Sequence, residues 1–327
     1  MMSSMNHCGE TLVADAAVVR RFLDKLAVRP AMERLFRDFA SGSAVQPPQI
    51  LTELPHGQGD FITYLGALAR EQVFGAKLSP YLVVAGGRPI VSAWTSLMSM
   101  QTGQPLLFCD SSLLTAERTA GTTTLAIEYL APATSRHLAL IGTGPLGRAH
   151  LRHALHLRPW DTIAVYADDL RDNPAMQVEI KSIDRRIEIF DSAQACVAHA
   201  EVIMLCTSSS TPVLDVTKLT RPALITSIST NAVNAHEIAP GCLSSMDVYC
   251  DNKKSTPDSA GEMVLAAKQT GWQRESIVGD LAELVTGRSP LPDYQRHVFF
   301  RSIGMGLEDV SIAYALWCAM SAAEGGV

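Results

Sequence analysis

Three glycines in the middle of the chain have the spacing of a phosphate-binding turn. Gly142, Gly144 and Gly147 form G-x-G-x-x-G directly after the apolar run 138–141, which is typical of a buried strand. The first glycine permits a tight turn, the second lets the backbone approach a pyrophosphate, and the third lets helix and strand pack closely. The free N–H groups at the start of the following helix would bind the phosphates of a dinucleotide. The residues that complete this loop are Thr143, Pro145 and Leu146.

An acidic residue follows the next strand-like run and indicates which dinucleotide is bound. Asp168 comes shortly after the apolar run 162–166. An acid at this place hydrogen-bonds to the ribose of NAD and would repel the 2′-phosphate of NADP. However, Ala167 stands where the acid is first expected, and Arg171 is close enough to help bind a phosphate. The sequence therefore predicts NAD or NADP, with NAD slightly favoured.

The second half of the chain must position these residues, and its pattern predicts a Rossmann fold. Apolar strand-like runs alternate with helical stretches, which predicts a doubly wound parallel sheet in an α/β protein. Thr207 and Ser208 follow one of these runs and could line the cofactor crevice. The strands expected are 138–142, 162–167, 186–190, 201–206, 223–228 and 248–251, and the helices are 145–157 and 192–199.

The first half of the chain predicts a second, mixed α+β domain. A helical pattern over 14–41, interrupted by Pro30, precedes several strand-like runs that are separated by Gly and Pro. A helix over 113–130 follows, and an apolar helix over 310–323 ends the chain and could pack back on this domain. The strands expected are 50–54, 60–65, 73–78, 89–94 and 105–109.

Composition narrows the class of protein further. The 327 residues suffice for two domains, and a net charge of −6 without a basic run gives no reason to expect a nucleic-acid partner. The sequence shows neither an apolar run of about 20 residues, as a membrane span needs, nor a signal-peptide pattern, so we expect a cytoplasmic protein without a membrane partner. The seven scattered cysteines include no C-x-x-C and suit a reducing compartment.

Three histidines after the glycine loop could suggest a metal site. His150, His153 and His156 are spaced by three, but on a helix the first and third lie too far round to share one ion easily. We interpret them as residues of the polar face and expect no metal.

Several further segments resemble the ornithine cyclodeaminase/μ-crystallin family. The segment 117–126 is similar to the family's R-T-A-A-x-S/T motif, and 74–77 is similar to its G-x-K strand. The other matching segments are 226–238, 279–287 and 300–309, and all occur in family order. The resemblance implies a substrate-binding and dimerisation domain over 1–130 plus 301–327, a Rossmann domain over 131–300, and a homodimer. It also implies NAD(P)-linked chemistry on a small amino or imino acid.

The resemblance also marks residues for the chemistry. Arg118 falls in the 117–126 motif, and its planar guanidinium could bind an α-carboxylate with two parallel hydrogen bonds. Lys77 could also hold the carboxylate or help proton transfer. Asn231 stands where cyclodeaminases carry an Asp, and a neutral amide cannot serve as a base. By family analogy, Ser302 and Gly304 could approach the nicotinamide.

The expected function is therefore that of an NAD(P)-dependent imine reductase or amino-acid dehydrogenase, with Lys77, Arg118 and Asn231 at the substrate. Tyr64 falls near a Glu of the cyclodeaminases, and Gln49 stands where many family members carry an Arg; together with Asn231, these changes argue against ornithine cyclisation. Two alternatives stay open: a cyclodeaminase-type lyase that recycles bound NAD, and a non-catalytic μ-crystallin-like protein that binds a nucleotide or another small ligand.

Overall fold

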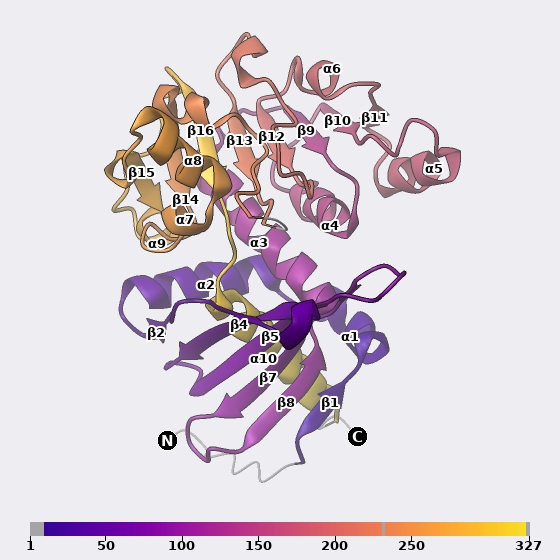
Figure 1. The fold of residues 1–327 in the computed structure, drawn as a ribbon, viewed down its shortest axis with the longest axis vertical. Coiled ribbons are helices and arrows are strands. Elements are labelled where there is room, and N and C mark those ends of the chain that lie inside the picture. The colour runs from indigo at the N-terminus through magenta and orange to yellow at the C-terminus, as the bar shows by residue number, and fades with distance from the viewer. Residues whose placement is uncertain (1–9, 231–232, 325–327) are drawn as a thin grey trace. The chain divides into compact units, whose positions relative to one another are not determined.

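A computed structural model describes residues 10–230 and 233–324, which divide into two compact units (Figure 1). The first unit comprises the chain up to Ala31, Ser41–Thr115 and the segment from Met305 onward. The second comprises Met32–Ala40 and Ala116–Gly304. This division falls inside helix α3 at 115/116 and in the turn at 304/305, whereas the sequence-based boundaries were 130/131 and 300/301. No helix among the described residues is long and apolar enough to cross a membrane.

The first unit is built on one mixed sheet with the strand order β1-β8-β7-β5-β4-β2. β3 pairs with β4, β6 pairs with β5, and every pair is antiparallel except the parallel pair β1–β8. The strands are β1 (Leu12–Ala14), β2 (Ala44–Val45), β3 (Ile50–Glu53), β4 (Gly59–Leu68), β5 (Val73–Leu82), β6 (Ile90–Val91), β7 (Trp94–Ser99) and β8 (Pro105–Asp110). The expected strand 89–94 is wrong in detail, because its residues divide between β6 and the start of β7.

Helix α10 (Gly306–Glu324) covers one face of this sheet, as expected for the apolar C-terminal segment. Alternation along β5 directs Val73, Gly75 and Lys77 toward the helix, because successive side chains of a strand point to opposite faces. Gly66 on β4 pairs with Gly75, and a Cβ at Gly66 would lie 3.0 Å from the Cα of Leu307. The glycine pair therefore lets the first turn of α10 lie directly on the sheet.

Two helices open the chain where one interrupted helix was expected. α1 (Ala16–Phe22) ends well before Pro30, and α2 (Val28–Ala40) contains Pro30 in its first turn. Proline is tolerated there because the first N–H groups of a helix have no partner within the helix. The break in the helical pattern is therefore the segment around the short 3-10 helix η1 (Leu23–Lys25), and Pro30 is not its cause.

The second unit contains eight parallel strands in the order β11-β10-β9-β12-β13-β16-β14-β15, which confirms the predicted Rossmann sheet (Figure 1). The strands are β9 (His137–Ile141), β10 (Thr162–Tyr166), β11 (Ile187–Ile189), β12 (Val202–Leu205), β13 (Leu224–Ser227), β14 (Met246–Cys250), β15 (Ile277–Asp280) and β16 (His297–Arg301). Its helices are α3 (Ser112–Leu130), α4 (Pro145–Ala154), α5 (Pro174–Ile183), α6 (Ala193–Val197), α7 (Thr256–Ser259), α8 (Gly261–Thr270) and α9 (Leu281–Val285). Short 3-10 helices are η2 (Pro55–Gly57) in the first unit and η3 (Val216–Lys218), η4 (Pro240–Ser245) and η5 (Arg274–Ser276) in the second.

The strand order reverses direction at β9. The chain runs from β9 outward through β10 and β11, then returns to β12 on the other side of β9. In open parallel sheets a ligand binds at such a switch point, outside the carboxyl ends of the strands. The glycine loop follows the carboxyl end of β9, so it lies at the switch point.

Candidate active-site residues in the two units

The glycine loop has the geometry that a dinucleotide requires. Gly142 has a φ of +99°, and a Cβ there would lie 2.6 Å from the carbonyl oxygen of Cys206 on the neighbouring strand end. A Cβ at Gly147 would collide with the carbonyl of Gly142, so both positions require glycine. Gly144 is the N-cap of α4, no side chain in the described part of the chain caps it, and the space beside its Cα is open. The helix start can therefore accept a pyrophosphate on its N–H groups.

The other loop residues keep this turn in place. Arg148 donates from Nε to the carbonyl oxygen of Thr143 at 2.9 Å, and its guanidinium pairs with Glu179 on α5. Pro145 and Leu146 form the first turn of α4, where proline loses no hydrogen bond. The loop thus has a fixed backbone.

Asp168 lies just beyond β10, the strand next to the glycine loop. The Tyr166 hydroxyl donates to its Oδ1 at 2.5 Å, and this hydrogen bond raises the pKa of Tyr166. Asp168 is exposed whereas Ala167 is buried, so of the two the acid is the residue that can reach a ligand. Arg171 donates to the carbonyl of Asp191 at 2.6 Å.

A buried carboxylate connects the carboxyl ends of the paired strands β12 and β13. Glu237 Oε1 accepts from the backbone N–H and the hydroxyl of Thr207, both at 2.7 Å. Its Oε2 accepts from the Ser227 hydroxyl at 2.8 Å and from the backbone N–H groups of Ile228 and Ser229. The hydroxyl of Thr207 is therefore turned toward Glu237, while Ser208 is exposed beside it. Glu237 was not predicted from the sequence as a functional residue. The structure shows that it is fully buried and connects two strand ends.

Asp251, like Glu237, is a buried carboxylate that binds the backbone after a strand, in this case β16. Its Oδ2 accepts from the Ser302 hydroxyl at 3.0 Å and from the N–H groups of Ile303 and Gly304 at 2.7 and 2.9 Å. Ser302 and Gly304, the predicted nicotinamide contacts, thus lie in a turn that a buried carboxylate fixes. The hydroxyl of Ser302 serves this turn.

Arg118 lies beside that turn. It is 5% exposed on α3, and a Cβ at Gly304 would lie 3.0 Å from its Nη2. The absent side chain of Gly304, whose φ is +78°, therefore makes room for the guanidinium.

The neighbouring Glu117 contacts His153 at 2.6 Å and Arg152 at 2.5 Å, which ties α3 to α4. Although burial raises the pKa of Glu117, these two partners lower it below its usual value.

Another buried ion pair, Arg301 with Glu262, contacts the backbone of Ser229 and Ala235. Arg301 donates to Glu262 Oε1 at 2.8 Å, and both side chains are fully buried. The same guanidinium donates to the carbonyl oxygens of Ser229 and, at 3.4 Å, of Ala235. Asn231, the predicted substrate residue, lies outside the described residues.

Lys77 of the first unit is buried and paired. Its Nζ lies 2.9 Å from Oδ2 of Asp309 on α10 and 4.2 Å from the centre of the Tyr64 ring. Tyr64, Lys77 and Thr95 are cross-strand neighbours in one row on the face that α10 covers. Thr95 and Ser111 share a hydrogen bond of 2.5 Å within the same unit. Asp309 was part of the resembling segment 300–309 but was not singled out.

The three histidines do not share a polar face as expected. His150 is fully buried, His153 is half-buried against Glu117, and only His156 is exposed. His150 Nδ1 lies 2.7 Å from the carbonyl oxygen of Leu146, so Nδ1 carries the proton and Nε2 accepts from Thr123 at 2.9 Å. Burial lowers the pKa of His150 to about 4. No group of three or more His, Cys, Asp or Glu side chains within the described ranges could hold a metal ion.

Known proteins resemble this chain over nearly its whole length. The model of the "Ornithine cyclodeaminase/mu-crystallin family" matches residues 10–323. The NAD(P)H-dependent anabolic L-arginine dehydrogenase of Pseudomonas aeruginosa is 52% identical over 306 residues, which cover 94% of this chain and 96% of that protein. The ketimine reductase mu-crystallin of Macropus fuliginosus is 22% identical and matches 94% of this chain and 96% of its own.

Solved structures share the fold. The Thermococcus litoralis Delta(1)-pyrroline-2-carboxylate reductase, in complex with NADH and L-proline, has a TM-score of 0.85 at 23% identity and covers 97% of this chain and 99% of its own. A probable ornithine cyclodeaminase from Bordetella pertussis has a TM-score of 0.86 at 26% identity with the same coverage. The match of the family model over 10–323 agrees with the motifs and the two-unit architecture. This chain therefore belongs to the ornithine cyclodeaminase/mu-crystallin family.

Proposed function

We propose that this protein is an L-arginine dehydrogenase that works reductively, forming L-arginine from its α-imino acid with NADH or NADPH. The chain is an NAD(P)-dependent oxidoreductase of small amino or imino acids, and the proposal adds the substrate and the direction. The observation that carries it is the 52% identity, over nearly the full length of both chains, to a relative named as an anabolic L-arginine dehydrogenase.

The chemistry is a hydride transfer to a carbon–nitrogen double bond. When bound, the nicotinamide supplies a hydride to the α-carbon, a proton goes to the nitrogen, and the imino acid becomes the amino acid. The helix start at Gly144 binds the pyrophosphate, and Asp168 binds the ribose. Arg118 binds the α-carboxylate of the substrate with its planar guanidinium, and the turn 302–304, held by Asp251, lies beside that guanidinium.

The roles of Lys77 and Asn231 remain part of the proposal. Lys77 is held by Asp309, which keeps its ammonium in one place in the first unit and suits either contact with a carboxylate or transfer of a proton. Asn231 is proposed to hydrogen-bond near the reacting nitrogen, and Arg301 supports the segment that flanks it.

The test is a reductive assay with the α-oxo acid of arginine, ammonium and NAD(P)H, in which the imine forms in solution. We expect consumption of NAD(P)H and formation of L-arginine, identified by chiral chromatography. Release of ammonia from ornithine without net change in NAD(P)H would support the cyclodeaminase alternative. Tight NAD(P)H binding without turnover of any imino acid would support the non-catalytic alternative.

We also propose a homodimer through the face of the first unit's sheet that α10 does not cover. Phe74, Leu78 and Phe108 are 41–45% exposed on this face, and Phe108 stacks on Trp94 with ring centres 4.9 Å apart. An apolar patch of this kind typically marks an interface, and a two-fold dimer would pair it with itself. A related archaeal alanine dehydrogenase is described as a dimer. Light scattering should give a dimer for the native chain and a monomer for Phe108→Lys; a native monomer would contradict this.

The proposed location is the cytoplasm. The buried thiols of Cys196, Cys206 and Cys250 form no disulfides, and burial raises their pKa values, which suits inert thiols in a reducing compartment. Fractionation of the source cells should recover the protein with the cytoplasmic enzymes.

A further inference from the structure

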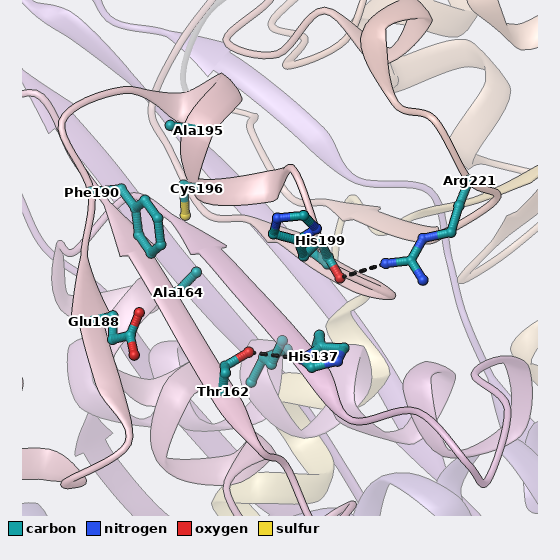
Figure 2. Close-up of a pocket in the computed structure, with 11 residues that line it drawn as sticks. His137, Thr162, Ala164, Glu188, Phe190, Ala195, Cys196, His199 and Arg221 are labelled. Atoms are coloured by element: carbon teal, nitrogen blue, oxygen red, sulfur yellow. Dashed lines mark hydrogen bonds between the residues drawn. The ribbon is translucent and has the colours of Figure 1, made fainter.

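A pocket of about 240 Å³ opens in the second unit on one face of the sheet, over β9, β10 and β11 (Figure 2). His137 and Thr162, the first residues of β9 and β10, line it and share a hydrogen bond of 2.9 Å (Figure 2). The glycine loop follows the other end of β9, so this pocket is separate from the dinucleotide crevice.

The pocket exists because the helix that covers this face of the sheet is short. Five residues of α6 span only about 7.5 Å, whereas the five residues of β9 or β10 span about 16 Å. α6 therefore covers only part of the strands. The side chains that could fill the remaining space are small, because Ala164 lies on the sheet and Ala195 and Ala200 lie on or after the helix.

The rim carries charges of opposite sign at separate places. Glu188 stands on one side of the pocket, and Arg221 stands on the other with His199 between them (Figure 2). Within the part of the chain that the structure describes, the carboxylate of Glu188 and the imidazole of His199 have no hydrogen-bond or ion-pair partner. Arg221 makes one long hydrogen bond of 3.5 Å, to the carbonyl of His199, which leaves most of its donors available. The ring of Phe190 lies next to Glu188.

We propose that this pocket binds a free amino acid with a cationic side chain, as a second ligand site apart from the catalytic one. The carboxylate of the ligand pairs with Arg221 and accepts a hydrogen bond from the His199 ring, and its cationic end pairs with Glu188. A guanidinium at that end would also stack on the Phe190 ring, as planar cations do on aromatic rings. A volume of about 240 Å³ suits a ligand of this size, because pockets for larger, drug-sized ligands start near about 300 Å³.

Hydrogen–deuterium exchange on the full-length protein tests the proposal, because it reports where a ligand binds. L-arginine is the probe, and acetate and guanidinium serve as its two separate halves. We expect L-arginine to protect the segments 187–190 and 193–200, and to bind there at least about tenfold more tightly than either half, since both charged ends are held. If acetate alone protects these segments as strongly as L-arginine does, the proposal of a site with two charged ends is overturned.

Two exposed residues offer variants with little risk to folding. Arg221→Gln and Glu188→Gln should each weaken L-arginine binding at these segments by about tenfold or more, since each removes a charge-assisted contact. Arg185→Gln and Glu275→Gln, exposed residues outside the pocket, are the matched controls. Equal protection in the pocket variants and the controls, or no protection in the native chain, would overturn the proposal. Reductase activity is measured separately in the same variants. A protein that does not form L-arginine in that assay would contradict the proposed function without affecting the test of this pocket.

Discussion

Lys77 and Asp309 form an ion pair inside the first unit, with Nζ 2.9 Å from Oδ2 and side chains only 2% and 1% exposed. The pair connects the middle of strand β5 to the first turn of α10, which the glycines at 66 and 75 allow to lie close to the sheet. Both charges must be compensated within the protein, since neither reaches water.

Removing one partner of this ion pair should lower the stability of the folded protein. Asp309→Ala leaves a buried ammonium without its counter-ion, and we expect a loss of about 3–5 kcal/mol in the free energy of unfolding. The double variant Lys77→Met/Asp309→Leu should be much closer to the native stability, because no charge remains buried. Urea unfolding measures both, with Lys218→Met, in an exposed pair, as the control. Equal losses in the single and double variants would contradict the ion-pair account.

Arg118 should act on the substrate more than on the cofactor. Arg118→Lys keeps the positive charge but loses the two parallel hydrogen bonds to a carboxylate. We expect the KM for the imino acid to rise about tenfold to a hundredfold, with a much smaller change in the KM for NAD(P)H. Steady-state kinetics measure both constants. Arg288→Lys, at an exposed position, is the control, and a substrate KM that changes no more than in this control would exclude the proposed role.

Asp168 should influence the choice between the two cofactors. Asp168→Ser removes the acceptor for the ribose hydroxyls and the negative charge that would repel a 2′-phosphate. We expect the ratio of kcat/KM for NADH to that for NADPH to fall by about tenfold or more, since a hydrogen bond to a charged group is lost. The neighbouring exposed Asp169 provides the control Asp169→Ser. An unchanged ratio in Asp168→Ser would mean that another residue selects the cofactor.

His150 should make the protein less stable in acid. Burial lowers its pKa in the folded state to about 4 from an unfolded value of 6.5. Below pH 6.5 His150 binds a proton in the unfolded chain but stays neutral in the folded protein. The free energy of unfolding therefore falls as the pH drops from 6.5 to 4. The loss reaches about 3 kcal/mol from this residue.

The contribution of His150 is measured as a difference between proteins. An amide in His150→Gln can still donate to the carbonyl of Leu146 and accept from Thr123, but it does not titrate. Urea unfolding between pH 7 and pH 4 should show a flatter dependence for this variant, while the exposed His156→Gln behaves like the native protein. Parallel curves for His150→Gln and the native chain would contradict the assignment.

Local patterns in the sequence predicted the Rossmann half well. The apolar run before Gly142 and the glycine spacing define a strand, a turn and a helix within about ten residues, so nothing distant is needed to recognise them. β15 and β16 were missed as strands, because the segments recognised by resemblance, 279–287 and 300–309, overlap only the last two residues of each. Helix α5 was missed because its apolar pattern is weak, even though Asn173 and Pro174 mark its start.

The supporting acids could not be predicted in the same way. Glu237 and Asp251 bind N–H groups and hydroxyls that follow distant strands, and only the order of strands in the sheet brings those groups together. The error on His150 has the same origin, because its partner Thr123 comes from another helix. Residue type and spacing therefore located the loops that we propose to bind ligands, but not the buried groups that hold these loops.

The substrate is identified by the reductive assay with the α-oxo acid of arginine, ammonium and NAD(P)H, compared with the α-oxo acids of alanine and ornithine under the same conditions. We expect kcat/KM to be highest for the arginine compound and the product to be L-arginine. Faster turnover of another oxo acid, with no L-arginine formed, would contradict it.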